Sequence, residues 1–409
     1  MISAMKEAVD LPFLRDRHSH VSLYAALDGC PDISRLDQDA ALRLLRALPQ
    51  DELSLVLGWY SARVAFSPAD LAALPPAIIV NFSLHGVLLT DAAKALLKDA
   101  QPELVERHRD AQWCERHVAE LLSLYGRCAP LTAAKLDAFM KKLDGLGVAS
   151  AEDMLVLGEP ALDCIASSPW AERVACWADP DAFLAMSPRA QGRIAGLKLF
   201  LDGALAMRTA ALHEPYLGGG DGLLLHEDEE LLAKLAGLAL LQKPLAIHAI
   251  GRRAVGQALQ ALERLAQDKV RLPAVRLEHV QFMDEAQAVR AKALGLVLCL
   301  QPNFSADSRD YADRLGPALR QANNPLRMLI DEAGFEPGED LVFGSDGMPH
   351  GAQAALQWAL FPDVPGQRLS AGELAAGYGP AWDKRRLKLS VDEGLRQVGP
   401  CRAEASCST

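Results

Sequence analysis

The sequence predicts an α/β fold in which eight strands alternate with helices and close into a (β/α)8 TIM barrel. From residue 131 onward, short apolar segments alternate regularly with helical patterns, which is typical of a parallel sheet covered by helices. One further apolar segment lies near the start of the chain, and eight such units are the number that closes a barrel. The expected strands lie at 11–20, 145–153, 173–177, 194–201, 244–248, 275–279, 296–301 and 340–346.

Helical patterns of suitable length fall between these strands. Apolar residues recur there at the spacing of one helix face, rather than in the strict alternation of a strand. After residue 130, the expected helices lie at 131–144, 158–166, 228–241, 252–268, 284–294 and 324–334.

The pattern divides the chain into four regions. Residues 1–29 hold the first barrel strand, and residues 30–130 form a long, mainly helical insertion that shapes the pocket. Residues 131–384 complete the barrel, and residues 385–409 form a C-terminal tail.

Composition excludes several classes of partner. The formal charge of −11, without a block of Lys and Arg, argues against nucleic acid. No apolar run is long enough to span a bilayer, and the first residues lack the apolar core of a signal peptide. Eight cysteines without a Cys-x-x-Cys pair, two of them in the polar tail at Cys401 and Cys407, indicate reduced thiols rather than a thiolate zinc site. We therefore expect a cytoplasmic protein that acts on a small molecule.

Polar side chains stand at or near the ends of five expected strands. In a barrel of this type, functional residues lie at the carboxyl ends of the strands. Each of these side chains has an ordinary explanation when it is taken alone, because a strand-end His is usually a satisfied polar group and an Asp before Gly often caps a turn. Together they offer His and carboxylate ligands without Cys, which suits a catalytic Zn, Mn, Fe or Ni site. These residues are His20, Lys198, His248, His279 and Asp346, and His18 shares a strand face with His20.

Lys198 lies inside an apolar strand. Burying a lysine costs several kcal/mol unless it is paired, modified or bound to a metal. An ion pair with Asp202 or Glu152 is one solution. Carboxylation of the amine, which turns a cation into a bidentate anion, is another.

An ordered set of motifs carries a resemblance to a known family. From residue 11 to about 350 the chain contains Leu-Pro-Phe-Leu-Arg-Asp-Arg-His-Ser-His, Gly-Leu-Lys-Leu-Phe-Leu-Asp-Gly-Ala-Leu-Ala-Met-Arg-Thr-Ala-Ala-Leu, Ala-Ile-His-Ala-Ile-Gly, Arg-Leu-Glu-His-Val-Gln, Gln-Pro-Asn-Phe and Phe-Gly-Ser-Asp. The set resembles the amidohydrolase superfamily, and within it the YtcJ-like branch that includes the N-substituted formamide deformylases.

The resemblance implies a ligand set. His18 and His20 would bind one metal, and His248 and His279 a second. Lys198, as its N-carboxylate, would bridge the two ions, and Asp346 would touch the first and handle protons. It implies two divalent ions, expected to be Zn with Mn, Fe or Ni as alternatives. Asp346, Lys198 and His279 are the expected catalytic residues.

Further residues are expected at the substrate. His85 stands where the family has an Asp-Gly-His near the substrate, with an ordinary loop histidine as the alternative. Arg208 matches a family Arg just beyond the lysine strand, and we expect it to anchor the substrate or a loop. Arg252 adds a positive charge where the family often has Asp, which favours an anionic substrate or is simply exposed to solvent. Gln301 and Asn303 end the seventh strand and offer polar contacts. The β-sandwich that family members build from both chain ends is expected to be absent or vestigial.

The combined expectation is a hydrolase that cleaves an amide-like C–N bond by metal-activated hydroxide. Asp346 would take the proton of the water and deliver it to the leaving nitrogen. A mononuclear-metal deaminase of the same fold is the first alternative, and Lys198 weighs against it. The second alternative is a catalytically silent barrel that binds a small molecule. A homodimer is compatible with the sequence, which does not specify the oligomeric state.

Overall fold

The computed structural model describes residues 7–61, 63–379, 382–400 and 402–403. Its centre is a sheet of eight parallel strands, arranged in the order β12-β11-β10-β9-β8-β7-β6-β2. This sheet confirms the predicted (β/α)8 barrel. The strands are β2 (Leu14–Ser19), β6 (Val148–Asp153), β7 (Val174–Ala178), β8 (Gly196–Phe200), β9 (Leu245–Ala249), β10 (Val275–His279), β11 (Val297–Leu300) and β12 (Leu341–Phe343).

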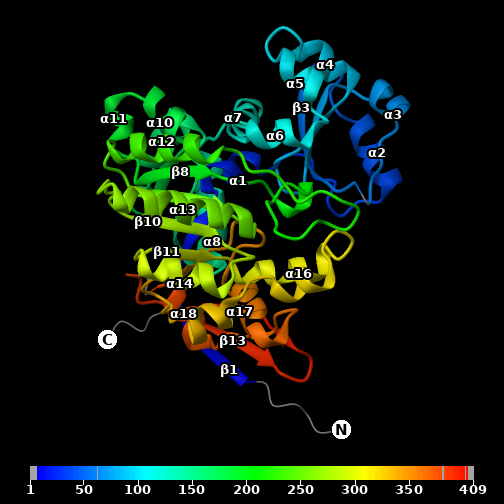
Figure 1. The fold of residues 1–409 in the computed structure, drawn as a ribbon. Coiled ribbons are helices and arrows are strands. Elements are labelled where there is room, and N and C mark those ends of the chain that lie inside the picture. The colour runs from blue at the N-terminus through cyan, green and yellow to red at the C-terminus, as the bar shows by residue number, and fades with distance from the viewer. Residues whose placement is uncertain (1–6, 62, 380–381, 401, 404–409) are drawn as a thin grey trace.

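Helices cover the outside of this sheet (Figure 1). Strands such as β6 and β9 are buried along their whole length, which explains their continuous apolar character in the sequence. The covering helices include α8 (Ala133–Gly145), α9 (Gly158–Ala166), α10 (Pro180–Ala185), α11 (Pro188–Gln191), α12 (Asp228–Ala239), α13 (Arg252–Gln267), α14 (Glu285–Ala293), α17 (Ala352–Leu360) and α18 (Ala371–Gly377). Short helices in the later loops are α15 (Asp307–Asp310), α16 (Pro317–Ala322) and a π-helical turn η4 (Met328–Glu332).

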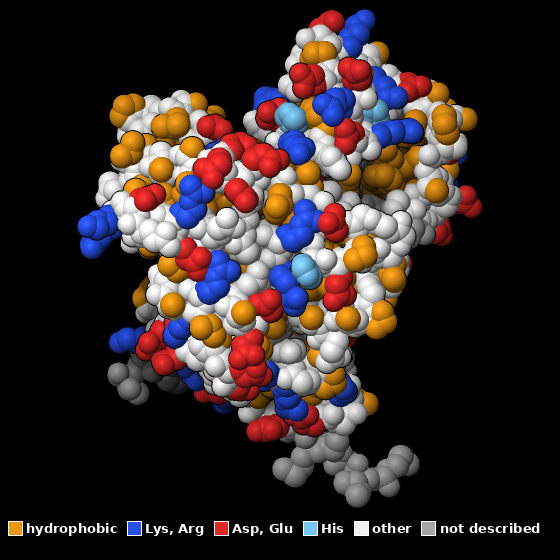
Figure 2. All heavy atoms as spheres, viewed as in Figure 1, with side chains coloured by type: hydrophobic (Ala, Val, Ile, Leu, Met, Phe, Trp, Pro, Cys, Tyr) orange, Lys and Arg blue, Asp and Glu red, His pale blue; other side chains and the backbone are white. Residues whose placement is uncertain are grey.

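The insertion between β2 and β6 forms a lobe of its own, coloured blue to cyan in Figure 1. It contains a small sheet of order β3-β4-β5 in addition to helices, and its apolar residues form two clusters of their own. In the space-filling view a notch separates this lobe from the helices α10 to α12, and acidic and basic side chains are interspersed over the visible face (Figure 2). Its elements are α1 (Val21–Leu27), α2 (Gln38–Arg46), β3 (Ser54–Trp59), α3 (Pro68–Ala73), β4 (Ala77–Asn81), β5 (Val87–Leu89), α4 (Asp91–Leu97), α5 (Pro102–Arg107), α6 (Ala111–Arg116) and α7 (Val118–Cys128).

The two ends of the chain meet in a small antiparallel sheet. Its strands are β1 (Glu7–Pro12), β13 (Arg386–Asp392), β14 (Gln397–Val398) and β15 (Arg402–Ala403). Figure 1 shows β1 and β13 side by side, far from the insertion lobe. The sandwich expected to be absent or vestigial is therefore a four-stranded remnant, to which the region expected as a tail contributes three strands. Cys401 and Cys407 lie outside the described residues.

The first and last strands of the barrel meet through backbone contacts. The amide groups of Ser345 and Asp346 both donate to the carbonyl oxygen of His18, at 3.1 and 2.7 Å. Gly344 makes this approach possible, because a Cβ at that position would overlap the backbone of His18. Within the described part of the chain, no helix combines the length and the apolarity needed to cross a membrane.

We predict that Gly344→Ala lowers the free energy of unfolding by about 1–3 kcal/mol, because the added methyl forces apart the backbones of β2 and the β12 loop. The midpoint of urea unfolding measures this change. Gly237→Ala is the matched control, since nothing lies within 4 Å of a Cβ at that helical position. It should leave the midpoint unchanged or raise it slightly. Equal midpoints for Gly344→Ala and the wild type would refute the proposed close contact.

Candidate metal centre

The barrel brings the six predicted ligand residues to one end. His18 lies near the end of β2, His20 directly follows that strand, Lys198 lies on β8, and Asp346 follows β12. His248 and His279 lie at the carboxyl ends of β9 and β10. The rings of His18 and His279 have centroids 4.7 Å apart, and those of His248 and His279 are 4.5 Å apart.

His18, His20 and Asp346 form the tightest group. Nε2 of His20 lies 3.1 Å from Oδ1 of Asp346, and Nε2 of His18 lies 3.5 Å from the same oxygen. One ligand atom from each residue lies within 4.8 Å of the other two. Three donors on two strands can therefore contact a single ion.

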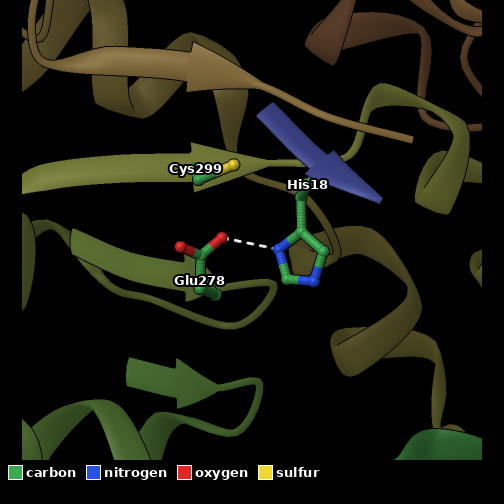
Figure 3. A group of neighbouring side chains, drawn as sticks. All are labelled: His18, Glu278 and Cys299. Carbon is green, nitrogen blue, oxygen red and sulfur yellow. Dashed lines mark hydrogen bonds and ion pairs between the residues drawn. The ribbon is translucent and has the colours of Figure 1, made fainter. Parts of the chain in front are cut away.

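Glu278 fixes the orientation of His18. Its Oε2 lies 2.6 Å from Nδ1 of His18, and the two side chains point toward each other from β10 and β2, which are not adjacent strands (Figure 3). Nε of Arg276 donates to the other oxygen of Glu278 at 2.5 Å. A carboxylate held in this way accepts the Nδ1 proton and leaves Nε2 as the free ligand atom, an arrangement typical of metal-bound histidine.

This geometry calls for a cation. Burial, followed by the charge of Lys198, holds the pKa of His18 well below its usual value, so the ring is neutral. Its Nε2 then presents a lone pair toward the Asp346 oxygen. Burial raises the pKa of Asp346, but the hydrogen bond from His20 and the nearby charges outweigh it, so the carboxyl is ionised. A lone pair and a carboxylate repel each other unless a positive ion lies between them, so these residues fit a divalent metal.

Cys299 stands next to Glu278 in the same group (Figure 3). Burial raises the pKa of its thiol well above the usual value. The neutral thiol is a poor metal ligand, since thiolate is the coordinating form.

Lys198 is buried, with its amine above the ring of Phe200. Its side chain is 1% exposed, and among the described residues its Nζ has no hydrogen bond. Burial lowers the pKa of the amine to about 8, although the charges of Glu278 and Asp346 act in the opposite direction. An unpaired amine with a depressed pKa is the form that can react with carbon dioxide. The orphaned atom therefore fits a carboxylated, metal-bridging lysine.

The ion pairs considered for Lys198 from the sequence are not formed. Asp202 accepts hydrogen bonds from the backbone amides of Ala211, Ile250 and Gly251. Glu152 pairs instead with Arg276, at 2.9 Å. Both carboxylates are thus committed elsewhere.

His248 and His279 are each oriented by a polar neighbour. Nδ1 of His279 lies 2.8 Å from Oε1 of Gln301, and Nε2 of His248 lies 3.3 Å from the carbonyl oxygen of Gly203. Burial holds the pKa of both rings well below the usual value, so both are neutral ligands. Each ring is left with one nitrogen that could bind a metal ion.

The residues expected at the substrate divide into two groups. His85 lies near the cluster, where its charge interacts with those of Asp346 and Lys198. Arg208 donates to the carbonyl oxygen of Leu217, and Arg252 lies 3.5 Å from Asp284. Both arginines are thus engaged with loop residues outside the ligand group.

The side chains of Gln301 and Asn303 form hydrogen bonds with other residues of the protein. Besides the contact of Gln301 with His279, Nδ2 of Asn303 donates to the carbonyl oxygens of Ser345 and Met348, at 2.8 and 2.6 Å. Asn303 thereby holds the loop that carries Asp346. These contacts orient His279 and the Asp346 loop, while Oδ1 of Asn303 has no hydrogen-bond partner among the described residues, and the direct substrate contact stays a prediction.

Asp16 is a second supporting residue that the sequence did not reveal. Its carboxylate accepts hydrogen bonds from the backbone and the hydroxyl of Ser345, at 2.9 and 2.5 Å. Burial raises its pKa to about 7. Asp346 is held with φ of 53°, an uncommon conformation for a non-glycine residue that these contacts maintain.

A parallel barrel with His, Lys and Asp at the carboxyl ends of its strands is the arrangement expected of a metal-dependent hydrolase. The profile described as "Amidohydrolase family" matches residues 8–361, so this chain belongs to the amidohydrolase family. The putative amidohydrolase YtcJ of Bacillus subtilis (strain 168) is 37% identical over 139 residues, which cover 33% of this chain and 26% of YtcJ. The match thus spans about a quarter of that relative. The predicted resemblance is confirmed.

Two solved structures share the fold. They are uncharacterized metal-dependent hydrolases from Pyrococcus horikoshii OT3 and Pyrococcus furiosus, both with a TM-score of 0.64 and 22% identity. The first alignment covers 91% of this chain and 78% of the other, and the second covers 92% and 86%.

We predict that Glu278→Gln weakens metal binding by about 10- to 100-fold, because the amide no longer holds His18 as a charged acceptor does. Titration of the metal-free protein with Zn²⁺ measures the affinity. Glu152→Gln is the control, since it removes another partner of Arg276 without touching His18. Equal affinities in the two variants would show that Glu278 acts only on stability.

Proposed function

We propose that this protein is a metal-dependent hydrolase that cleaves an amide-like C–N bond of a small molecule. The observation that carries the proposal is the meeting of His18, His20 and Asp346 with a neutral imidazole lone pair facing a carboxylate. Membership of the amidohydrolase family supports the same class of reaction.

The ligands divide between two ions. His18, His20 and Asp346 would hold one ion, His248 and His279 a second, and the carboxylated Lys198 would lie between them. Divalent ions at such a site lower the pKa of a coordinated water and polarise a substrate carbonyl. Gln301 and Glu278 keep the ring nitrogens aimed at the ions.

Asp346 is the proposed proton carrier. Its Oδ1 faces the two histidines, and among the described residues its Oδ2 has no hydrogen-bond partner. The side chain is 18% exposed, so substrate and water can reach it. Oδ2 would accept a proton from the attacking water and donate it to the departing nitrogen. An amine leaves readily only when it is protonated, which explains why an ionised carboxylate is needed beside the ions.

The walls next to the ligands are partly aromatic. The ring of Phe304 lies parallel to that of His279, with centroids 5.9 Å apart. Phe200 packs against His248 and lies beneath the Lys198 amine. Such walls exclude water and favour an uncharged acyl group at the site of cleavage.

The direct test is a panel of small amides on the Zn²⁺- or Mn²⁺-loaded protein. The panel contains p-nitroformanilide, p-nitroacetanilide, other N-acyl amines and cyclic amides. We expect hydrolysis of at least one class, and Asp346→Asn should reduce kcat by about 10²- to 10⁴-fold through loss of the proton carrier. Unchanged turnover in Asp346→Asn would remove this residue from the mechanism. Release of ammonia from amino-heterocycles by a one-metal enzyme would instead support the deaminase alternative.

We predict that Lys198→Ala loses at least one of two bound metal ions per chain, because the bridging group is absent. Elemental analysis of the purified protein measures this stoichiometry. Native mass spectrometry of the wild type should also show the added mass of one carbon dioxide, which the variant lacks. Lys198→Ala with the metal content of the wild type would contradict the bridge.

A further inference from the structure

The insertion lobe contributes a buried carboxylate close to the ligand cluster. Glu115 lies on α6, and its side chain is 1% exposed. Its Oε2 accepts from Nδ1 of His85 at 2.7 Å, and its Oε1 accepts from Oγ1 of Thr209 at 2.6 Å. The two oxygens of one carboxylate thus join the β4–β5 turn of the insertion to the loop after β8.

Gly203 shows how closely these parts approach. A Cβ on Gly203 would lie 2.6 Å from the carboxyl carbon of Glu115 and would also overlap Oγ1 of Thr209. Gly203 follows the strand of Lys198, and its carbonyl oxygen lies next to Nε2 of His248. Glu115 therefore packs directly on a backbone segment that also orients a proposed metal ligand.

His85 is held by only one of its two ring nitrogens. Nδ1 is bound to Glu115, whereas among the described residues Nε2 has no hydrogen-bond partner. The side chain is 16% exposed. The charged groups that face it are Glu115 on α6, Lys198 on β8 and Asp346 after β12, and His248 on β9 interacts with it as well. His85 therefore lies close enough to the proposed reaction centre for the charges of that centre to act on its ring.

We propose that Glu115 is a positioning residue, which fixes the His85 ring through Nδ1 and keeps it protonated at both nitrogens, so that Nε2–H can donate a hydrogen bond to the substrate. This inference rests on the proposed hydrolytic function. It assigns the insertion a chemical part in the reaction, beyond shaping the pocket. The group that receives the hydrogen bond is the acyl oxygen, on which negative charge develops during attack by water.

The charge balance around His85 agrees with a donor at Nε2. Burial lowers the pKa of the ring, but the charge of Glu115 and its hydrogen bond outweigh burial, and the pKa of His85 lies above its usual value. The carboxylate that pairs with His85 comes from the insertion. His18, His248 and His279, in contrast, are neutral and suited to bind metal.

A purely structural role for Glu115 is the competing explanation, since the carboxylate also accepts from Thr209 and from the backbone amide of Ala204. Two variants separate the roles. Glu115→Gln retains an oxygen for Thr209 and Ala204 but replaces the oxygen that faces His85 with an NH2 group. Thr209→Val removes the hydroxyl donor and leaves the contact between Glu115 and His85 in place.

The first measurement does not depend on turnover. In the metal-loaded, 15N-histidine-labelled protein, the Nδ1–H signal of His85 is assigned by its loss in His85→Ala. We expect this signal in the wild type and in Thr209→Val, and its loss or a large shift in Glu115→Gln. An unchanged signal in Glu115→Gln would overturn the positioning role.

The second measurement is a double-mutant cycle on the chromogenic amides p-nitroformanilide and p-nitroacetanilide. Glu115→Gln should lower kcat by about 10- to 100-fold with a smaller change in KM, because without the carboxylate the ring loses its positive charge and donates more weakly to the developing oxyanion. In the His85→Ala background the same change should have no further effect beyond about twofold. If the reductions in kcat caused by Glu115→Gln and His85→Ala multiply in the double variant, the proposal is overturned. If the wild type hydrolyses no amide, the proposed function fails together with the substrate role of His85, and the NMR signal alone decides the pairing.

Discussion

The contact between the first and last barrel strands is the constraint on which the site depends. His18 and His20 come from β2, whereas Asp346 follows β12, more than 300 positions later in the chain. Two backbone amides donate to the carbonyl oxygen of His18 across this junction, and Gly344 allows the approach. Since the side chains are attached to the same backbone that makes these bonds, closing the barrel also assembles the tightest ligand group.

Because the charged groups around the centre are buried, each needs a partner within the protein. The buried carboxylates around the centre are each committed to a partner, since Glu278 holds His18, Asp16 holds the Ser345 loop, Asp202 binds three backbone amides and Glu115 holds His85. Lys198 differs, because among the described residues its amine has no hydrogen-bond partner. A buried amine without a hydrogen-bond partner is costly. That contrast is the strongest physical reason to expect a modification and ions at this place.

The sequence predicted the barrel because its signal is local. A strand buried on both faces is rich in apolar residues, as in β9, where His248 stands near the end, and in β8, where Lys198 stands in the middle. The structure brings the rings of His18, His248 and His279 together. The small sheet was harder to predict. Leu387, Leu389 and Val391 alternate with exposed residues in β13, but the partner of that strand is β1, whose pairing depends on the whole fold.

The supporting residues were not predicted, and the reason is geometric. In Arg-Leu-Glu-His, period-two alternation places Arg276 and Glu278 on one strand face, so a buried ion pair was a readable signal. The sequence carried no signal that Glu278 contacts His18, which lies 260 positions away. Gln301 and Asn303 were correctly placed near the centre, but the sequence could not show that their amides face His279 and the Asp346 loop. Arg208 and Arg252 show the same limit, because their partners come from separate loops.

The insertion leaves the barrel immediately after a proposed metal ligand, since α1 begins at Val21, next to His20. That end of β2 is braced twice, by the bond from the amide of Met154 to the carbonyl oxygen of Ser19 and by the bond from the amide of Ser22 to Asp153. The ligand-bearing backbone is thus fixed by the barrel itself, independently of how the lobe folds farther out. A lobe anchored in this way can change its outer loops without moving the ligands. Glu115 contacts His85 and Thr209 and so connects the lobe to the proposed reaction centre. This contact therefore links the shape of the pocket to the proposed chemistry.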